Sequence, residues 1–338
     1  MIIQLNDNNT AIVQGKINEC LEQLKVPFYP VHTQRASYLV CTPEGPFDIR
    51  NIGHLEGVRD VHVVANKHKM VNKRWKVENT VIDLGDNIRI GGNDLAIMAG
   101  PCSIDSDENI DKTVSRLVAS GVRIMRGGVF KPRTSPYSFM GKGLPGLLSF
   151  YSKCKAAGVK VITEIMEPSQ LELMYPYVDI FQVGARNSQN FALLEALGKT
   201  DKPVMIKRGI SGTIDELLFS AEYVFKNGNE RLILCERGIR SFESSYRNTL
   251  DLNAVPILKE KSHLPVIVDP SHGIGLRKHV RQMALAGVAA GADGLIVEMH
   301  PEPDKALTDT QQTIDFKEFS LMVEQCRQVK NLMTSFNG

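Results

Sequence analysis

Four residues that can bind a transition metal ion stand far apart in the chain, where apolar runs end or a loop follows. They are Cys102, His272, Glu298 and Asp309. A thiolate, an imidazole and two carboxylates make a donor set of mixed softness, which suits a divalent ion such as Mn, Fe, Co or Zn. The sequence therefore predicts a metal site, provided that the fold brings these segments together. His300 is a competing ligand that the sequence alone does not exclude.

Basic side chains collect at similar places, directly after apolar runs. The set comprises Arg126, Lys131, Arg133, Arg186, Lys207, Arg208 and Arg237. Guanidinium groups bind phosphates and carboxylates through paired hydrogen bonds. Convergence of these cations, in a chain with a net charge of only +2, predicts a binding site for anions. Arg208 is the weakest member, because adjacent residues at the end of a strand point in different directions.

The elements that must position both sets repeat along the second part of the chain. Eight short apolar runs cover residues 95–99, 122–125, 159–162, 180–183, 204–206, 232–234, 266–268 and 295–297. Helical segments lie between them, among them 106–120, 143–157, 213–227 and 276–290. This alternation predicts a (β/α)8 TIM barrel, and in such barrels the active site lies where all strands end. A doubly wound open sheet is the alternative, but residues 99–103 lack its glycine-rich first turn.

Residues 1–66 differ from the barrel segment and predict a small ferredoxin-like α+β domain. Strands are expected at 2–5, 36–41 and 58–64, and a helix capped by Asn9 or Thr10 should run to about residue 25. A short helix can follow Pro46, which completes a βαββαβ order. The segment holds no glycine loop and no metal-ligand spacing, so we expect a regulatory or structural role.

The remaining boundaries follow from charge and turn residues. Residues 67–79 are rich in Lys and Arg and predict a linker whose charges are solvated. The catalytic barrel should occupy 80–338 and begin with a hairpin at 80–92, because alternating apolar residues flank the turn residues 85–87.

Composition excludes several classes of protein. Lys and Arg number 40 and Asp and Glu 38, which argues against a nucleic-acid-binding surface over the whole molecule. No apolar run approaches the ~18 residues of a membrane-spanning helix, and the start of the chain does not resemble a signal peptide. The six cysteines are scattered, which is typical of reduced thiols in a cytoplasmic protein.

Six short motifs resemble class I 3-deoxy-D-arabino-heptulosonate 7-phosphate (DAHP) synthases. They are Gly-Pro-Cys-Ser at 100–103, Lys-Pro-Arg-Thr-Ser at 131–135, Gly-Ala-Arg-Asn at 184–187, Lys-Arg-Gly at 207–209, Cys-Glu-Arg-Gly at 235–238 and Asp-Pro-Ser-His at 269–272. The N-terminal unit resembles that of the β subtype. The resemblance implies condensation of phosphoenolpyruvate with erythrose 4-phosphate, the first step of the shikimate pathway.

A neighbouring family, the 3-deoxy-D-manno-octulosonate 8-phosphate synthases, is the alternative. These enzymes use phosphoenolpyruvate with arabinose 5-phosphate, and their second loop resembles Lys-x-Asn-Arg-Ser-Ser. The loop 131–135 of this chain reads Lys-Pro-Arg-Thr-Ser, which favours the four-carbon sugar phosphate. A phosphometabolite sensor without catalysis is a second alternative, and it would not require the metal ligands.

The resemblance also assigns roles to residues of this sequence. It implies that the metal is bound by Cys102, His272, Glu298 and Asp309. Phosphoenolpyruvate would be bound by Arg126, Lys131, Arg186, Lys207 and Arg237, and erythrose 4-phosphate by Pro132, Arg133, Thr134 and Ser135. Catalysis would rest on the metal ligand His272, on Lys131 as proton donor and on Glu164, which would orient the attacking water. Asp269 would orient a neighbouring cation or His272.

The resemblance finally implies partners beyond the substrates. Phenylalanine or tyrosine would act as feedback ligand at the N-terminal domain, and the protein would form a homo-oligomer, commonly a tetramer. Neither nucleic acid nor a membrane is expected as a partner.

Overall fold

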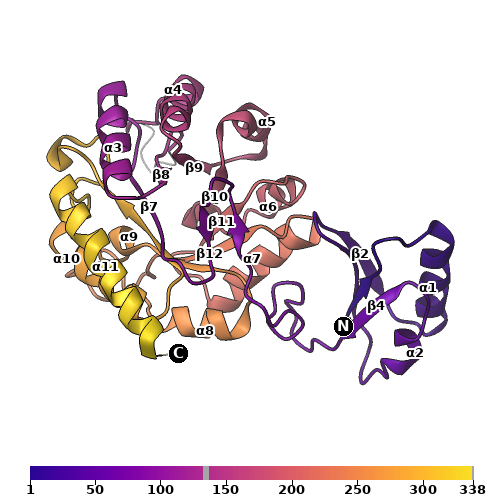
Figure 1. Cartoon of the computed structure of the whole chain (residues 1–338). Coiled ribbons are helices and arrows are strands. Elements are labelled where there is room, and N and C mark those ends of the chain that lie inside the picture. Colours follow the sequence, from indigo (N-terminus) through magenta and orange to yellow (C-terminus); the bar gives the residue numbers. More distant parts are fainter. Residues whose placement is uncertain (132–136, 337–338) are drawn as a thin grey trace.

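Parallel strands close a barrel in the part of the chain that the computed structural model describes, residues 1–131 and 137–336 (Figure 1). The eight strands of this barrel are β7 (Ala96–Gly100), β8 (Ile124–Arg126), β9 (Lys160–Ile165), β10 (Ile180–Val183), β11 (Val204–Lys207), β12 (Leu232–Glu236), β13 (Val266–Val268) and β14 (Gly294–Glu298). Each strand pairs with its neighbours in sequence, and β14 pairs with β7 to close the ring. The predicted (β/α)8 barrel is therefore confirmed, and the open sheet is excluded.

Helices surround the barrel, as Figure 1 shows. They are α3 (Asp107–Ala119), α4 (Gly143–Ala156), α5 (Leu171–Met174), α6 (Phe191–Gly198), α7 (Ile214–Lys226), α8 (Ala254–Lys261), α9 (Pro270–Ile274), α10 (Arg277–Ala289) and α11 (Phe316–Phe336). Their starts follow the sequence: the Ser106 hydroxyl accepts from the backbone N–H of Asn109, and Thr213 forms a capping box with Glu216. Among the described helices, none combines the length and the apolar character needed to cross a bilayer.

A separate core fills the inside of the barrel and is closed at one end by the hairpin β5 (Ile82–Asp83) and β6 (Arg89–Ile90). Ile82 and Ile90 pack with the inward-facing strand residues, and Cys235 belongs to the same buried cluster. The turn between the strands needs left-handed backbone, with φ of 77° at Gly85 and 59° at Asn87. The predicted hairpin is thus present. Within the described part of the chain, it contributes no residue to the other end of the barrel, where the strands finish.

The N-terminal elements are β1 (Ile2–Leu5), α1 (Ala11–Gln23), β2 (Phe28–His32), β3 (Ser37–Cys41), α2 (Arg50–Gly53) and β4 (Val58–His62). Their antiparallel sheet has the order β2-β3-β1-β4, which is the arrangement of a ferredoxin-like unit. Thr10 is the N-cap of α1. β2 is an addition to the strands expected from the sequence. It contains Pro30, which is tolerated because β2 is an edge strand.

The linker packs more deeply than its charges suggest. Met70, Val71 and Trp75 are buried, and the Glu222 carboxylate of α7 accepts the backbone N–H groups of residues 69, 70 and 71 at 2.9–3.1 Å. The Trp75 ring lies edge-on to Tyr38 of the small sheet and to Phe225 of α7. The expected run of solvated charges is therefore a strap with a buried apolar side, which joins the two units.

The small domain contacts the end of the barrel where strands begin. Gln34, in the β2–β3 turn, donates to the carbonyl of Thr200 and accepts from the N–H of Glu230, and Arg35 forms an ion pair with Glu230. These partners precede β11 and β12 in the chain. These contacts therefore do not cover the opposite end of the barrel, where the strands finish.

His263 beside the strap gives a prediction for stability in acid. Its ring nitrogens lie 2.8 Å from the Thr80 hydroxyl and 2.9 Å from the Met70 carbonyl. Burial, with the nearby charge of Lys76, lowers the pKa of His263 from 6.5 to about 3. The unfolded chain takes up this proton below pH 6.5 and the folded chain does not. The free energy of unfolding should therefore fall by about 1.4 kcal/mol per pH unit between these two values.

Urea unfolding of wild type and His263→Gln between about pH 7 and pH 5 tests this prediction. Gln keeps the polar contacts within reach but does not titrate, so its stability should decline less steeply with acid than that of wild type. Equal slopes for the two proteins would contradict the assigned cause.

Candidate active site

The four predicted metal ligands lie together at the end of the barrel where the strands finish. Their ligand atoms are all within 4.8 Å of one another. The Cys102 Sγ is 2.8 Å from Asp309 Oδ2, and His272 Nε2 is 3.4 Å from Glu298 Oε1. Because Zn-type ions sit about 2.0–2.3 Å from such ligands, the set fits one divalent ion held between its members.

Separate elements bring these ligands to one place. Cys102 follows β7, Glu298 ends β14, and His272 lies on α9, whose N-cap is Asp269. Asp269 accepts from the His272 backbone N–H at 3.0 Å, and its Oδ2 is 2.8 Å from His272 Nδ1. The predicted orienting role of Asp269 is thus matched by contact, and the imidazole Nε2 is left facing the cluster.

The electrostatics of the cluster favour a cation among the carboxylates. Burial, and after it the Glu298 charge, raises the pKa of the Cys102 thiol to about 11. Burial would also raise the pKa of Glu298, but His272 and Arg126 outweigh it and keep this pKa below its usual value. A bound divalent ion would provide the positive charge that a thiolate needs here.

His300 does not join this cluster. Its Nε2 lies 2.7 Å from Asp105 Oδ2, and its Nδ1 accepts from the backbone N–H of Glu302. The side chain is buried in these contacts, so the competing ligand that the sequence left open is assigned a structural role.

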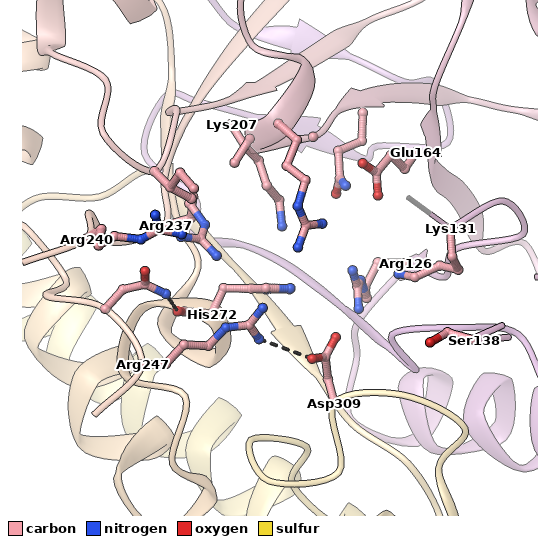
Figure 2. Close-up of a pocket in the computed structure, with 16 residues that line it drawn as sticks. Arg126, Lys131, Ser138, Glu164, Lys207, Arg237, Arg240, Arg247, His272 and Asp309 are labelled. Carbon is pink, nitrogen blue, oxygen red and sulfur yellow. Dashed lines mark hydrogen bonds and ion pairs between the residues drawn. The ribbon is translucent and has the colours of Figure 1, made fainter. Parts of the chain in front are cut away.

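A cavity of about 520 Å³ adjoins the cluster, and basic side chains point into it (Figure 2). Among the described residues its cationic lining consists of Arg126, Lys131, Arg186, Lys207, Arg237, Arg240 and Arg247. Glu164 and Asp309 are the carboxylates of the same lining, and His272 connects the cavity to the metal ligands. Five of the predicted cations thus converge, and the excess of positive charge suits an anionic ligand.

Some of these cations are held by carboxylates and others are not. Lys207 Nζ lies 2.5 Å from Asp269 Oδ2, and Arg126 lies 2.8 Å from Glu298 Oε1. Within residues 1–131 and 137–336, Arg186, Arg237 and Arg240 form no ion pair with a carboxylate. Burial is the main reason that the pKa of Arg237 is lowered. These three guanidinium groups are available for an external anion.

Lys131 connects the cavity to the metal ligands. Its Nζ lies 3.0 Å from both the carbonyl oxygen and the Sγ of Cys102. A Cβ at Gly128 would lie 2.8 Å from Lys131 Cδ, so glycine is needed there for the lysine to fold back. Burial opposes its charge, yet Cys102 and Glu164 raise the pKa of Lys131 above its usual value. The ammonium group is therefore protonated and buried beside the cluster.

Glu164 faces the cavity from β9 and depends on a second glycine. A Cβ at Gly184 would approach Glu164 Oε1 to 1.9 Å, so a larger residue there would displace this carboxylate. In the described part of the chain, Glu164 forms no ion pair with Lys207 or Arg186. Because neither cation holds it there, its carboxylate can accept from a ligand or water.

Arg208 lies outside the cavity, as the direction of its side chain predicts. It is buried and donates to Glu236 at 2.9 Å and to Asp251 at 2.8 Å. The residues predicted to bind the sugar phosphate, Pro132, Arg133, Thr134 and Ser135, lie outside the described residues, and their role stays a prediction.

Several residues of this site were not predicted from the sequence. They are Ser138, Gln182, Ile210, Arg240, Arg247 and Asn248. Gln182 had a signal, because it is a polar residue inside the apolar run of β10. Arg240, Arg247 and Asn248 lie in the loop after β12, whose path does not follow from periodicity.

Comparisons with known proteins identify the family. The model of the DAHP synthetase I family matches residues 75–335. A phospho-2-dehydro-3-deoxyheptonate aldolase of Thermotoga maritima is 47% identical over 279 residues, covering 82% of each chain. A 2-dehydro-3-deoxyphosphooctonate aldolase of Desulfatibacillum aliphaticivorans is 31% identical, over 72% of this chain and 94% of that protein.

Solved structures agree with this assignment. A crystal structure of the Thermotoga maritima DAHP synthase superposes with a TM-score of 0.79 at 40% identity, covering 98% of this chain and 97% of that one. A truncated form of the Thermotoga maritima enzyme gives a TM-score of 0.73 at 44% identity, covering 78% of this chain and 96% of that one. The chain is an enzyme with a cationic cavity at the end of its barrel, and it belongs to the DAHP synthetase I family.

Proposed function

We propose that the protein is a metal-dependent 3-deoxy-7-phosphoheptulonate synthase, which condenses phosphoenolpyruvate with erythrose 4-phosphate to DAHP and phosphate. The observation that carries the proposal is the cavity in which seven cationic side chains adjoin the four-ligand cluster. Two phosphates and one carboxylate on the substrates match this charge. Membership of the family supplies the reaction class.

Phosphoenolpyruvate would occupy the inner part of the cavity. Arg186 and Arg237 have no carboxylate partner among the described residues and are proposed to bind its phosphate with Lys207. Arg126 and Lys131 are buried next to the cluster and would bind its carboxylate. Arg133, Thr134 and Ser135, with Pro132 stiffening their loop, are proposed to hold the phosphate of erythrose 4-phosphate.

The reaction joins C3 of phosphoenolpyruvate to the aldehyde carbon, water adds at C2, and phosphate leaves by C–O cleavage. A divalent ion bound by Cys102, His272, Glu298 and Asp309 would act as a Lewis acid on the aldehyde. Lys131 would deliver the proton from Nζ to the aldehyde oxygen. Glu164, which forms no ion pair with Lys207 or Arg186 among the described residues, would orient the water.

The relatives and the second loop support erythrose 4-phosphate as the acceptor. The heptonate aldolase shares 47% identity with this chain, and the octonate aldolases given above and from Syntrophobacter fumaroxidans share 31% and 29%. The Lys-Pro-Arg-Thr-Ser loop also favours the four-carbon acceptor.

Release of inorganic phosphate tests the proposed class. We expect release only when phosphoenolpyruvate, an aldose phosphate and a divalent ion are all present. Chelation should stop it, and adding back Mn, Fe, Co or Zn should restore it. A sensor would bind phosphoenolpyruvate without releasing phosphate, and that result would refute the proposal.

Arg133 provides a prediction on the acceptor. Arg133→Ala should mainly raise the KM for erythrose 4-phosphate, by the equivalent of about 1.5–3 kcal/mol for a lost charged hydrogen bond. Steady-state kinetics with each substrate varied in turn measures it. A rise confined to the KM for phosphoenolpyruvate would place this arginine at the other substrate.

Residues 1–66 are proposed as a regulatory domain, 67–79 as a linker and 80–338 as the catalytic unit. Phenylalanine or tyrosine would be the feedback ligand, and a homotetramer the assembly. The contacts of Gln34 and Arg35 hold the small domain at the end of the barrel opposite the cavity.

Deleting residues 1–66 should leave turnover and abolish inhibition by phenylalanine or tyrosine, because every described residue of the cluster and cavity lies beyond residue 100. Activity of the full-length and shortened chains, with and without millimolar amino acid, measures both effects. A folded but inactive shortened chain would contradict the modular arrangement. A full-length enzyme insensitive to both amino acids would contradict the feedback proposal.

A further inference from the structure

Two carboxylates of the metal cluster each turn one oxygen away from it. Glu298 presents Oε1 toward His272 and Arg126, and Asp309 presents Oδ2 toward Cys102. The remaining oxygens, Glu298 Oε2 and Asp309 Oδ1, need partners of their own. Glu298 is 1% exposed, and a buried carboxylate oxygen without a hydrogen bond is costly.

Gln312 and Arg247 supply these partners as one connected unit. Gln312 Nε2 donates to Glu298 Oε2 at 2.6 Å. Arg247 Nη1 donates to Gln312 Oε1 at 2.8 Å and lies 3.1 Å from Asp309 Oδ1. Figure 2 shows Arg247 reaching toward Asp309 across the cavity. One guanidinium nitrogen thus serves both carboxylates, directly at Asp309 and through the amide at Glu298.

The charges of Arg247 and Glu298 determine the orientation of the Gln312 amide between them. The Gln312 amide has one accepting and one donating end. With its oxygen on the Arg247 cation, its NH₂ must face the Glu298 carboxylate. The flipped amide would oppose oxygen to oxygen and NH₂ to guanidinium, two repulsive contacts. Arg247 therefore sets the orientation of Gln312, and Gln312 sets which oxygen of Glu298 faces the cluster.

Backbone geometry supports a constrained placement. Asp309 has a φ of 54°, a left-handed conformation that a non-glycine residue keeps only when its surroundings hold it. The neighbour of Arg247 adds a further contact, because Asn248 Nδ2 donates to the backbone oxygen of His272 at 2.9 Å. The loop after β12 thereby contacts Asp309 and His272 directly, and Glu298 through Gln312.

We propose that Arg247 and Gln312 are positioning residues that hold Glu298 and Asp309 in the geometry that binds the metal. The inference rests on the proposed metal-dependent function. Neither residue is a ligand: Gln312 is 2% exposed behind Glu298, and Arg247 carries the same charge sign as the ion. Outer partners of metal ligands typically contribute about 10–100-fold to metal affinity, and the same range is expected here.

The test measures Co²⁺ binding to the full-length protein by equilibrium titration, together with the absorption band of the Cys102 thiolate–Co²⁺ pair. Gln312→Leu removes the donor. Gln312→Glu keeps the shape and places an acceptor against Glu298. Gln311→Leu is the matched control, because this exposed neighbour uses only its backbone oxygen, toward Arg277. Arg247→Lys keeps the charge but replaces the rigid planar guanidinium by an ammonium group on a flexible stem.

We expect Co²⁺ affinity about 10–100-fold lower in both Gln312 variants, a shifted thiolate band, and wild-type behaviour in Gln311→Leu. Arg247→Lys should fall in the same direction, and combining it with Gln312→Leu should cost less than the sum of the two. Wild-type affinity and an unchanged band in Gln312→Leu and Gln312→Glu would overturn the inference and leave the proposed function intact. Failure of both Gln312 variants to fold would assign the residue to stability and also overturn it. Wild type that binds no Co²⁺ would refute the metal site itself.

Discussion

Cys102→Ala should lose metal affinity and turnover together. Loss of an outer partner typically lowers metal affinity about 10–100-fold, and removal of one of four ligands should exceed that range. The thiol is 2% exposed and lies between Asp309 and Lys131. Alanine would therefore remove a hydrogen-bond partner from each of these two charged groups. Metal titration and phosphate release on the same preparation measure the two losses.

Cys154→Ala is the matched control for this variant. Cys154 is also fully buried, but it lies on α4 with its sulfur against Met125, away from the cluster. It should lose some stability and keep its metal affinity. Full activity of Cys102→Ala in the presence of a chelator would contradict the assignment of Cys102. Oxidants should inactivate wild type through the same thiolate.

Lys131→Met should lower kcat by about 10²–10⁴-fold, the range for a missing general acid. Methionine fills a similar volume but carries no proton and no charge. Because Lys131 also faces the cavity, the KM for phosphoenolpyruvate should rise as well. Steady-state kinetics at saturating metal separates the two effects, since a lysine that only bound substrate would change KM far more than kcat.

Lys202→Met serves as the control. This half-buried lysine precedes β11 and donates to the carbonyl of Val178, which precedes β10, so both lie at the end of the barrel where the strands begin. It should keep wild-type kinetics. A kcat within a few-fold of wild type in Lys131→Met would remove Lys131 from the proton transfer and leave that step to another group.

Periodicity predicted the barrel because its strands are buried on both faces. Val266–Val268 is apolar throughout, and Ile180–Val183 is apolar except for Gln182; helices with marked caps separate such segments. The small domain was harder. Its edge strand, Phe28–His32, is mostly exposed and contains Pro30, so it lacks the alternating pattern that indicates a strand. The strap was misjudged because its charges outnumber the buried Met70, Val71 and Trp75.

The site was predictable where side chains directly follow strands. Cys102, Glu298 and Lys207 occupy positions that a barrel turns toward one mouth, so position and residue type sufficed. Arg247 and Gln312 carried no such signal. Their importance depends on a hydrogen-bonded path between the loops after β12 and β14, and contacts between loops follow from tertiary packing rather than from local pattern.

The most direct measurement of the central claim is turnover with competing acceptors. Purified protein with phosphoenolpyruvate and a divalent ion should be given erythrose 4-phosphate or arabinose 5-phosphate, and kcat/KM should be determined for each from phosphate release and product mass. We predict a clear preference for erythrose 4-phosphate, with DAHP as product and loss of turnover on chelation. A preference for arabinose 5-phosphate, or undiminished turnover in chelator, would contradict the account.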